Sequence, residues 1–503
     1  MSDELEMRGI VKRFPGVLAN DGIDLAVRTG EIHALMGENG AGKTTLMSIL
    51  YGLHQPDAGE ILMRGEKVRF TSPIDAIAHG LGMVHQSFKL FNTLTVWENV
   101  VFRAEPQRRG FIDKPVARAR VRELSDRFGL QVDPDAVVGR LPVGVRQRIE
   151  ILKALYRDAR ILVLDEPTAV LTPQECRGLF AVMRNLASDK RTILFVTHKL
   201  REVIEVTDRI TVLRDGRVAS RLVTRETNPE QITRAMTGRN VFFTARRGKP
   251  QLDKPLLEVT DLTVGEGPKP VVNGVSLRVH AGEIVGVAGV AGNGQSELVE
   301  AIVGLRDHSQ GSIEIAGHDV GGKPLRDRRQ AGIAYIPEDR AITGTALAAT
   351  ATDNLSLGFH RDPPLSRGVF LDLEAMRIRA RGLIERFTIK IPNEMTAVGT
   401  LSGGNLQKVV AARELSHQAA VIIAEQPTRG LDVGATEFIH QAMVAQRDAG
   451  RAVLLISSEL SEIMSLADRI LVMYEGRIVA DMPADQADEA KLGLLMAGAQ
   501  GHG

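Results

Sequence analysis

The 503-residue chain has little of what marks secreted, membrane-spanning or nucleic-acid-coating proteins. Cys176 is its only cysteine, which excludes an internal disulfide and indicates a reducing compartment; a single thiol near a predicted helix is expected to be a buried bystander. The 63 basic and 62 acidic residues leave a net charge of +1, so a nucleic acid or an anionic membrane could be bound only by a local patch. The start MSDELEMRG is not apolar, and about 18 apolar residues never run together, so we expect neither a signal peptide nor a membrane span.

The sequence contains an internal duplication. Gly30-Glu31-Ile32 reappears as Gly282-Glu283-Ile284, and Asp208-Arg209-Ile210 reappears as Asp468-Arg469-Ile470. The offset grows from 252 to 260 between these points, so the second copy carries eight extra residues. We predict two copies of one domain, at residues 1–243 and 256–503, joined by a short polar linker at 244–255.

Each copy has the pattern of an α/β domain. Short continuous apolar runs predict strands buried on both faces of a mainly parallel sheet, at Ile32–Met36, Ile161–Leu164 and Ile193–Val196. Helical patterns separate these runs. Leu46, Ile49 and Leu50 share one helix face in the first copy, as Leu298, Ala301 and Ile302 do in the second.

A glycine-rich segment follows the first of these strands. It reads Gly-x-x-x-x-Gly-Lys-Thr between a strand and a helix, which is the setting that a phosphate-binding loop needs. Its glycines let backbone N–H groups face phosphate oxygens, Lys43 can place its ammonium on the β and γ phosphates, and Thr44 can ligate Mg²⁺. The candidate nucleotide-binding residues are Gly37, Glu38, Asn39, Gly40, Ala41, Gly42, Lys43, Thr44 and Thr45.

Two adjacent carboxylates, Asp165 and Glu166, follow the predicted strand Ile161–Leu164. One can hold the Mg²⁺ shell, and the other can orient or deprotonate a water that attacks a phosphate. Helix capping is the alternative role for an Asp-Glu pair. The phosphate loop upstream favours the catalytic role, so we predict phosphoryl transfer to water.

The ordered set of motifs resembles the ATP-binding cassette family over nearly the whole chain. It comprises GENGAGKTT, the segment at Gln86, LSGGN at Leu401 to Asn405, LDEPT, and His198 after a strand. The resemblance implies two cassettes, each with a mainly parallel RecA-like core, an antiparallel β subdomain and a helical signature subdomain. It implies that ATP lies between the phosphate loop of one cassette and the signature of the other. Gln86 would sense Mg²⁺ and the γ-phosphate, His198 would contact the γ-phosphate, and Phe14 would stack on adenine, although a histidine or an aromatic at such positions can also belong to the core.

At matched positions, the second copy lacks most of these groups. Gln295 stands where the first copy has Lys43, within the loop Gly289 to Ser296 that also holds Gly294. Four further exchanges are Asp165 to Glu425, Glu166 to Gln426, Gln86 to Glu338 and His198 to Ser458. Loss of a general base alone costs about 10²- to 10⁴-fold in rate, so we predict negligible hydrolysis at the second loop.

The signature motifs show the opposite asymmetry. Ser402, Gly403 and Gly404 keep a hydroxyl and backbone N–H groups at a helix start, suited to a γ-phosphate. The first copy has Pro142 and Val143 there, which remove the hydroxyl and one N–H and add bulk, although proline still allows a helix to begin. We therefore predict one competent ATP site, with Thr44, Gln86 and Asp165 toward Mg²⁺, and one incompetent site.

The resemblance also bears on what the ATP drives. Tandem cassettes with a short linker, LSGGN and QPTRGLDVGA look like the ATPase subunit of bacterial importers for simple sugars or nucleosides. GMVHQSFKLFNTLTVWEN and GVAGNGQSELVEAI are closer to the nucleoside branch, with simple sugars as the alternative. The implied partners are two membrane permease subunits, docking near 87–97 and after Glu338, and an extracytoplasmic binding protein. The chain would lie peripherally on the cytoplasmic face of the inner membrane.

Two other function classes fit the sequence less well. A soluble tandem cassette that acts on ribosomes or DNA would be expected to have a long charged inter-domain segment or basic arms, which the short linker and the net charge of +1 argue against. A regulatory module that holds ATP without turnover is disfavoured by Glu166 and His198.

Overall fold

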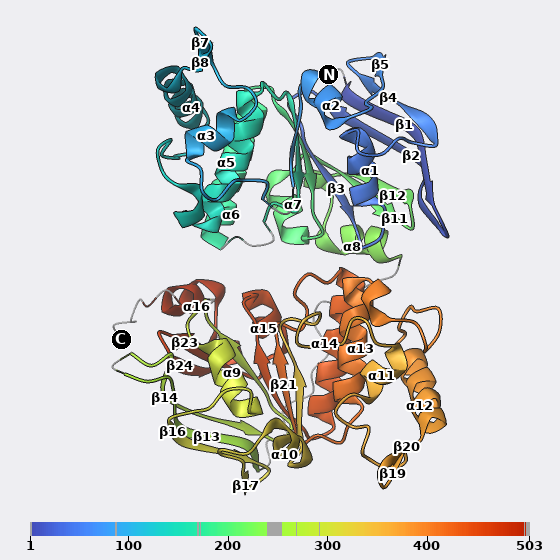
Figure 1. Ribbon diagram of the computed structural model, residues 1–503, viewed down its shortest axis with the longest axis vertical. Helices are drawn as coiled ribbons and strands as arrows, with labels where there is room; N and C mark the ends of the chain where they lie inside the picture. The colour runs from blue at the N-terminus through green and yellow to red at the C-terminus, as the bar shows by residue number, and fades with distance from the viewer. Residues whose placement is uncertain are drawn as a thin grey trace. The chain divides into compact units, whose positions relative to one another are not determined.

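The computed structural model describes residues 3–85, 88–168, 171, 173–238, 254–267, 269–290, 292–496 and 498. The chain divides into two compact units, Met1–Val241 and Phe242–Gly503, called unit 1 and unit 2 below. Figure 1 shows the helices and strands of both units. Gln86 and residues 244–253 of the predicted linker lie outside the described residues, and Pro255 begins a strand.

Unit 1 is built around a six-stranded sheet in the order β12-β11-β3-β10-β9-β6. Its strands pair in parallel except β11 and β12, which are antiparallel. The apolar runs of the sequence form the buried centre of this sheet, as expected for strands covered on both faces. The bounds are β3 Ile32–Gly37, β6 Leu81–Val84, β9 Ile161–Asp165, β10 Thr192–Val196, β11 Arg209–Arg214 and β12 Arg217–Val223.

An antiparallel sheet in the order β2-β1-β4-β5 forms a second layer of unit 1. Its strands are β1 Asp3–Phe14, β2 Val17–Arg28, β4 Ala58–Met63 and β5 Glu66–Val68. Apolar side chains from this sheet, from β3 and from α1 (Lys43–Leu50) form one buried cluster. Leu46, Ile49 and Leu50 all belong to it, which confirms the predicted helix face.

Helices complete unit 1. In Figure 1, α3, α4 and α5 and the small hairpin β7–β8 lie on the other side of the central sheet from β1 and β2. Trp97 on α3 is buried, so it belongs to the core. Cys176 on α6 is only partly buried, which corrects the expectation of a buried thiol. The remaining bounds are α2 Pro73–Ala78, α3 Val96–Val101, β7 Gln107–Arg108, β8 Phe111–Ile112, α4 Lys114–Phe128, α5 Val143–Tyr156, α6 Pro173–Ser188, α7 Leu200–Val206 and α8 Pro229–Thr237.

Unit 2 repeats this topology. Its six-stranded sheet has the order β18-β21-β22-β15-β23-β24, and its antiparallel sheet has the order β14-β13-β16-β17. The strands are β13 Pro255–Val264, β14 Val272–His280, β15 Ile284–Ala288, β16 Gln310–Ile315, β17 His318–Asp319, β18 Ile333–Ile336, β19 Ser366–Arg367, β20 Phe370–Leu371, β21 Val421–Glu425, β22 Ala452–Ile456, β23 Arg469–Tyr474 and β24 Arg477–Pro483. The helices are α9 Gln295–Val303, α10 Leu325–Gln330, α11 Ala351–Ser356, α12 Leu373–Arg386, α13 Gly403–Leu415, α14 Val433–Asp448, α15 Leu460–Leu466 and α16 Glu489–Met496.

The extra residues of the second copy lie mostly in loops around α11. The loop 337–350 before α11 is longer than its counterpart 85–95, and the loop 357–365 after α11 is longer than 102–106. The shared sheet order is unaffected because the additions fall outside the strands.

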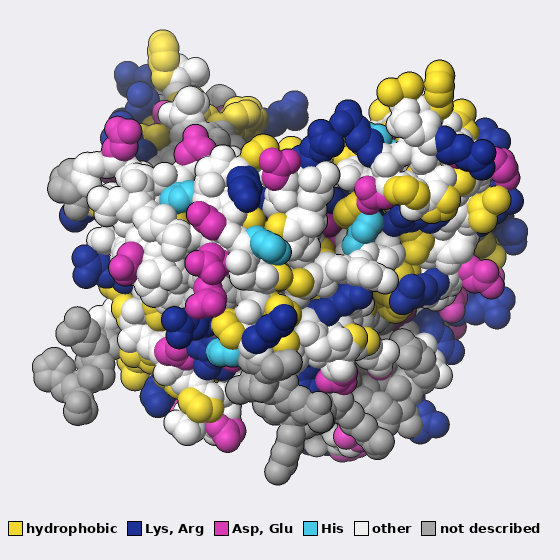
Figure 2. Space-filling model, turned by 90° about the horizontal axis from the view of Figure 1, so that it is seen from below, with side chains coloured by type: hydrophobic (Ala, Val, Ile, Leu, Met, Phe, Trp, Pro, Cys, Tyr) yellow, Lys and Arg dark blue, Asp and Glu magenta, His cyan; other side chains and the backbone are white. Residues whose placement is uncertain are grey.

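The distribution of surface charge and the hydropathy of the helices both agree with the composition. On the face drawn in Figure 2, basic side chains are interspersed with acidic ones rather than gathered into one large patch. Among the described residues, no helix is both long and apolar enough to cross a bilayer.

Candidate functional site

The glycine-rich loop of unit 1 connects β3 to α1, as the sequence predicts. Gly42 caps α1 with φ +97°, and a β-carbon there would lie 2.3 Å from the Ala19 carbonyl oxygen, so only glycine fits. Gly40 has φ +85° and faces open space. Lys43 is buried, and its Nζ donates to the carbonyl oxygens of Gly37 at 2.7 Å and Glu38 at 3.0 Å. The ammonium is thus held inside the loop.

The two carboxylates lie at the carboxyl end of the central sheet. Asp165 is the last residue of β9, and Glu166 follows it with φ +47°, its N–H donating to the Val196 carbonyl oxygen at 2.9 Å. His198 follows β10, and its Nδ1 lies 3.0 Å from Oε1 of Glu166. Parallel strands thus bring together the carboxylate and the imidazole predicted from separate motifs.

The adjacent carboxyl groups have opposite pKa shifts. Burial, together with the charge of Glu166, raises the pKa of Asp165 to about 6, although Lys43 opposes the shift. The hydrogen bond from His198 lowers the pKa of Glu166, against the effect of burial. Glu166 is therefore fully ionised at neutral pH, which suits a base or a water-orienting group.

The residues available for Mg²⁺ in unit 1 fit a hard cation. Thr44 is exposed at the second position of α1, and no hydrogen-bond donor to Asp165 is found among the described residues. A buried carboxylate that repels its neighbour gains from a nearby cation, and hydroxyl and carboxylate oxygens are ligands that Mg²⁺ prefers.

Phe14 lies at the end of β1, opposite Val17 of β2. Its ring is partly exposed and meets His54 edge-on at 5.5 Å between ring centroids. The same hairpin reaches the phosphate loop, because Asn20 Nδ2 donates to the Gly42 carbonyl oxygen at 3.1 Å. Asn20 was not predicted from the sequence, because its full burial in β2 is seen only in the structure.

In unit 2, the matching loop has different residues at key positions, and they make different contacts. Gly292 and Gly294 keep positive φ angles of +90° and +99°. Gln295 folds back like Lys43, with Nε2 donating to the Val290 carbonyl oxygen at 3.3 Å, but it brings no charge. Glu425 is buried and hydrogen-bonded by Ser296 and by the Tyr335 hydroxyl, the latter at 2.7 Å. Tyr335 was not predicted, and no pattern in the sequence marks it.

The residues at the other three exchanged positions in unit 2 also have partners. Gln426 repeats the strained geometry of Glu166, with φ +46°, but its Oε1 accepts a neutral hydrogen bond from Ser458 Oγ at 3.1 Å. Glu338 is ion-paired with Arg429. The base and the imidazole of unit 1 are thus replaced by an uncharged pair.

The two signature helices differ at their first turn. Ser402 is the N-cap of α13, and its Oγ accepts from the Asn405 N–H at 3.4 Å and from Asn405 Nδ2 at 3.0 Å. In unit 1, α5 begins at Val143 after Pro142, which supplies no side-chain cap. The prediction that this helix still forms is confirmed. Val143 is partly exposed at the position that Gly403 takes in unit 2.

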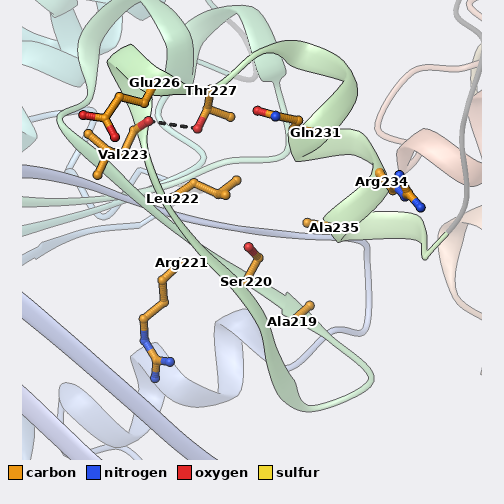
Figure 3. Close-up of a pocket in the computed structure, with 10 residues that line it drawn as sticks. All are labelled: Ala219, Ser220, Arg221, Leu222, Val223, Glu226, Thr227, Gln231, Arg234 and Ala235. Carbon is orange, nitrogen blue, oxygen red and sulfur yellow. Dashed lines mark hydrogen bonds between the residues drawn. The ribbon is translucent and has the colours of Figure 1, made fainter.

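A hollow of about 590 Å³ lies elsewhere in unit 1, between β12 and α8 (Figure 3). Arg221, Arg234 and Gln231 line it, and a hydrogen bond of 2.8 Å joins Thr227 to the Val223 carbonyl oxygen. None of the predicted site residues lines this hollow.

Comparison with known proteins accounts for the duplicated motifs. A model of the ABC transporter family matches residues 20–169 and 272–429. The chain belongs to the ABC transporter family. Each matched segment contains one phosphate loop and the strand that carries its acidic pair or the replacement, and the chain binds and hydrolyses ATP as an ATPase of this type.

Several curated relatives match this ABC ATPase over almost its whole length. It is 47% identical to the guanosine import ATP-binding protein NupO of Bacillus subtilis, covering 98% of this chain and 97% of NupO. It is 43% identical to the nucleoside import ATP-binding protein NupA of Lactococcus lactis, covering 98% of both. It is 44% identical to the glucose import ATP-binding protein TsgD13 of Haloferax volcanii, covering 98% of this chain and 96% of that one.

A solved structure matches almost the whole length of the chain. It is a complex of the archaeal ribosomal stalk protein aP1 with the archaeal ribosome recycling factor aABCE1, and it matches with a TM-score of 0.64, covering 98% of this chain and 92% of that one. At 19% identity, the likeness shows the shared fold alone.

Proposed function

We propose that this ABC ATPase drives import of a nucleoside through a membrane permease. The observation that carries the proposal is the 47% identity to a guanosine import ATP-binding protein with near-complete coverage of both chains. A second nucleoside import protein, at 43%, supports it.

The implied partners are two transmembrane permease subunits and an extracytoplasmic solute-binding protein. The chain itself would then be a peripheral subunit on the cytoplasmic face of the membrane. The helical part of each unit, following β6 and β18, is the proposed docking region for the permeases.

We propose the following roles at the loop of unit 1. Lys43 and the loop N–H groups hold the phosphates, and Phe14 stacks on adenine. Thr44, Gln86 and Asp165 hold Mg²⁺, which supplies charge neutralisation on the phosphates when bound. Glu166 orients and deprotonates water, while His198 holds the Glu166 carboxylate and contacts the γ-phosphate.

We propose that the phosphate loop of unit 1 and the signature of unit 2, which keep the expected residues, bind the same ATP. Unit 1 keeps Lys43 and Glu166, whereas unit 2 keeps Ser402 and the glycines after it. If each unit closed its own site, both sites would contain defective parts. If each ATP is instead bound by the phosphate loop of one unit and the signature of the other, one site has all the expected residues. Gln295, Glu425 and Gln426 then belong to the incomplete site.

Uptake measurements test the solute. Cells with and without this chain are supplied with labelled guanosine, adenosine, ribose and glucose. Cells that lack the chain should not take up nucleosides. Uptake should be restored by the parent protein, but not by a Glu166→Gln variant. Loss of sugar uptake alone would overturn the nucleoside assignment.

A simple-sugar importer is the second candidate. The 44% identity to a glucose import protein favours it, and that identity is close to those of the nucleoside proteins. The two candidates share every residue role above, because the proposed solute-selecting parts belong to other subunits. The sugar arm of the uptake experiment separates them.

A further inference from the structure

Arg340 lies at the signature of unit 2 and has no role in the proposed chemistry so far. It belongs to the loop 337–350, which is longer than its counterpart in unit 1. The loop is fixed around it: Thr345 Oγ1 donates to the Arg340 carbonyl oxygen at 2.9 Å, and the Gly344 N–H donates to the Asp339 carbonyl oxygen at 2.9 Å. The side chain therefore starts from an ordered backbone.

The guanidinium of Arg340 lies against the first residue of α13. Its Nη1 donates to the Arg429 carbonyl oxygen at 2.7 Å. Its Nη2 lies 2.8 Å from the point where a β-carbon of Gly403 would be, and 3.6 Å from the same point at Gly430. A β-carbon at residue 403 would force the guanidinium to shift, so Gly403 leaves room for the position that the Arg340 side chain takes.

Arg340 lies near the charge of Asp339 but does not form an ion pair with it. Among the described residues, no carboxylate lies within ion-pair distance of it; Asp339 Oδ1 accepts instead from the backbone N–H groups of Ala341 and Ile342, both at 2.8 Å. The neighbouring Arg429 is paired with Glu338. Burial lowers the pKa of Arg340, against the opposing effect of the Asp339 charge.

A cation at a helix N-terminus is a mismatch in the free protein. The dipole of α13 places partial positive charge at Ser402 and Gly403, where an anion is favoured and a guanidinium is not. A phosphate at this point would satisfy the helix N-terminus, the Ser402 hydroxyl and the guanidinium together.

The degenerate signature lacks this cation. Phe88 stands at the matched position of unit 1, and Val143 stands where Gly403 makes room for the guanidinium. The arginine thus accompanies the signature that keeps its serine and glycines. It is absent from the one that has lost them.

We infer that Arg340 contacts the terminal phosphate of the ATP that the Ser402 signature serves, and stabilises the charge on that phosphate during hydrolysis. The inference rests on the proposed function, because that function places the signature at an ATP. In this role Arg340 is a catalytic residue in addition to Glu166. Its planar fork can give two parallel hydrogen bonds to phosphate oxygens.

The test compares Arg340→Gln and Arg340→Lys with the parent protein in ATP hydrolysis and in vanadate trapping of nucleotide. Loss of a charge-assisted contact in the transition state should lower kcat by about 10- to 100-fold in Arg340→Gln, with KM changed by less than about threefold. Vanadate trapping should weaken in parallel. Arg340→Lys should recover part of kcat, since the charge returns without the fork.

Arg377→Gln is the matched control, because Arg377 is an arginine of α12 in the same unit whose side chain is partly exposed and lies 3.8 Å from Glu374. It should leave kcat and trapping unchanged, and melting temperatures should show that every variant is folded. Unchanged kcat in Arg340→Gln, or an equal loss in Arg377→Gln, would overturn the inference. The Ser402→Arg variant distinguishes failure of the Arg340 inference from failure of the proposed function. If Ser402→Arg abolishes hydrolysis while Arg340→Gln does not, the inference fails and the proposed function stands. Full activity in both variants would refute the proposed signature role as well.

Discussion

Asp165 and Glu166 are neighbours in the chain, yet their surroundings push their pKa values in opposite directions. Burial beside Glu166 raises the pKa of Asp165 to about 6, and the hydrogen bond from His198 lowers that of Glu166. Two carboxyl groups so separated can perform different tasks at one pH. In unit 2, Glu425 takes the first position with hydrogen bonds from Ser296 and Tyr335, and Gln426 cannot ionise.

The raised pKa of Asp165 predicts a pH-dependent loss of stability in the nucleotide-free protein. The folded chain keeps a proton on Asp165 between its ordinary pKa of 3.8 and about 6, whereas the unfolded chain releases it. The stabilisation from that proton is complete below the lower value and is lost as pH rises through about 6. Asp165→Asn removes the cost of ionisation, so it should be more stable than the parent at about pH 7.5, by about 1 to 3 kcal/mol.

Thermal melting of both proteins at about pH 4 and 7.5 checks this sign. The difference between them should be near zero at the lower pH and should favour Asp165→Asn at the higher one. The parent must also gain more than Asp165→Asn from added Mg²⁺ and ATP. A variant that is less stable than the parent at both pH values would show that Asp165 has a stabilising partner instead.

The regular elements were predictable to within a residue or two at their ends because they follow continuous apolar runs. The predicted strand Ile32–Met36 is β3 with one more residue, and Ile161–Leu164 is β9 with Asp165 added. The side-chain contacts that differ between the two nucleotide loops were not predictable, because they join segments that are distant in the sequence. Tyr335 meets Glu425 only through the pairing of β18 with β21.

The two signature helices give a prediction for single elements. Ser402→Arg places a long cation at the capped start of α13 and should abolish ATP hydrolysis, with a loss of about 1 kcal/mol from the cap itself. Pro142→Arg alters the uncapped start of α5 and should leave the rate within about twofold, since that signature already lacks its hydroxyl. Steady-state ATPase rates and helix content by circular dichroism measure both effects. Equal losses of activity would contradict the proposed pairing of sound parts.

Over the whole molecule, two units with the same sheet order have diverged at complementary places. Unit 1 keeps the hydrogen-bonded pair of Glu166 and His198 but has an uncapped signature helix. Unit 2 has a capped signature helix but a neutral pair of Gln426 and Ser458. The duplicated fold is thus retained while the chemistry becomes concentrated in one proposed site.

This asymmetry predicts a burst of one ADP per chain. Rapid mixing of saturating ATP with the parent, followed by quenching, should give one fast equivalent of ADP. Only unit 1 has both the phosphate-loop lysine, Lys43, and the catalytic glutamate, Glu166. Glu166→Gln should abolish the burst while nucleotide remains bound, since the loop contacts of Lys43 do not depend on it. Gln426→Glu should not add a second equivalent, because Gln295 still lacks the cation that holds the phosphates. Two equivalents released at comparable rates in the parent would refute the single-site assignment.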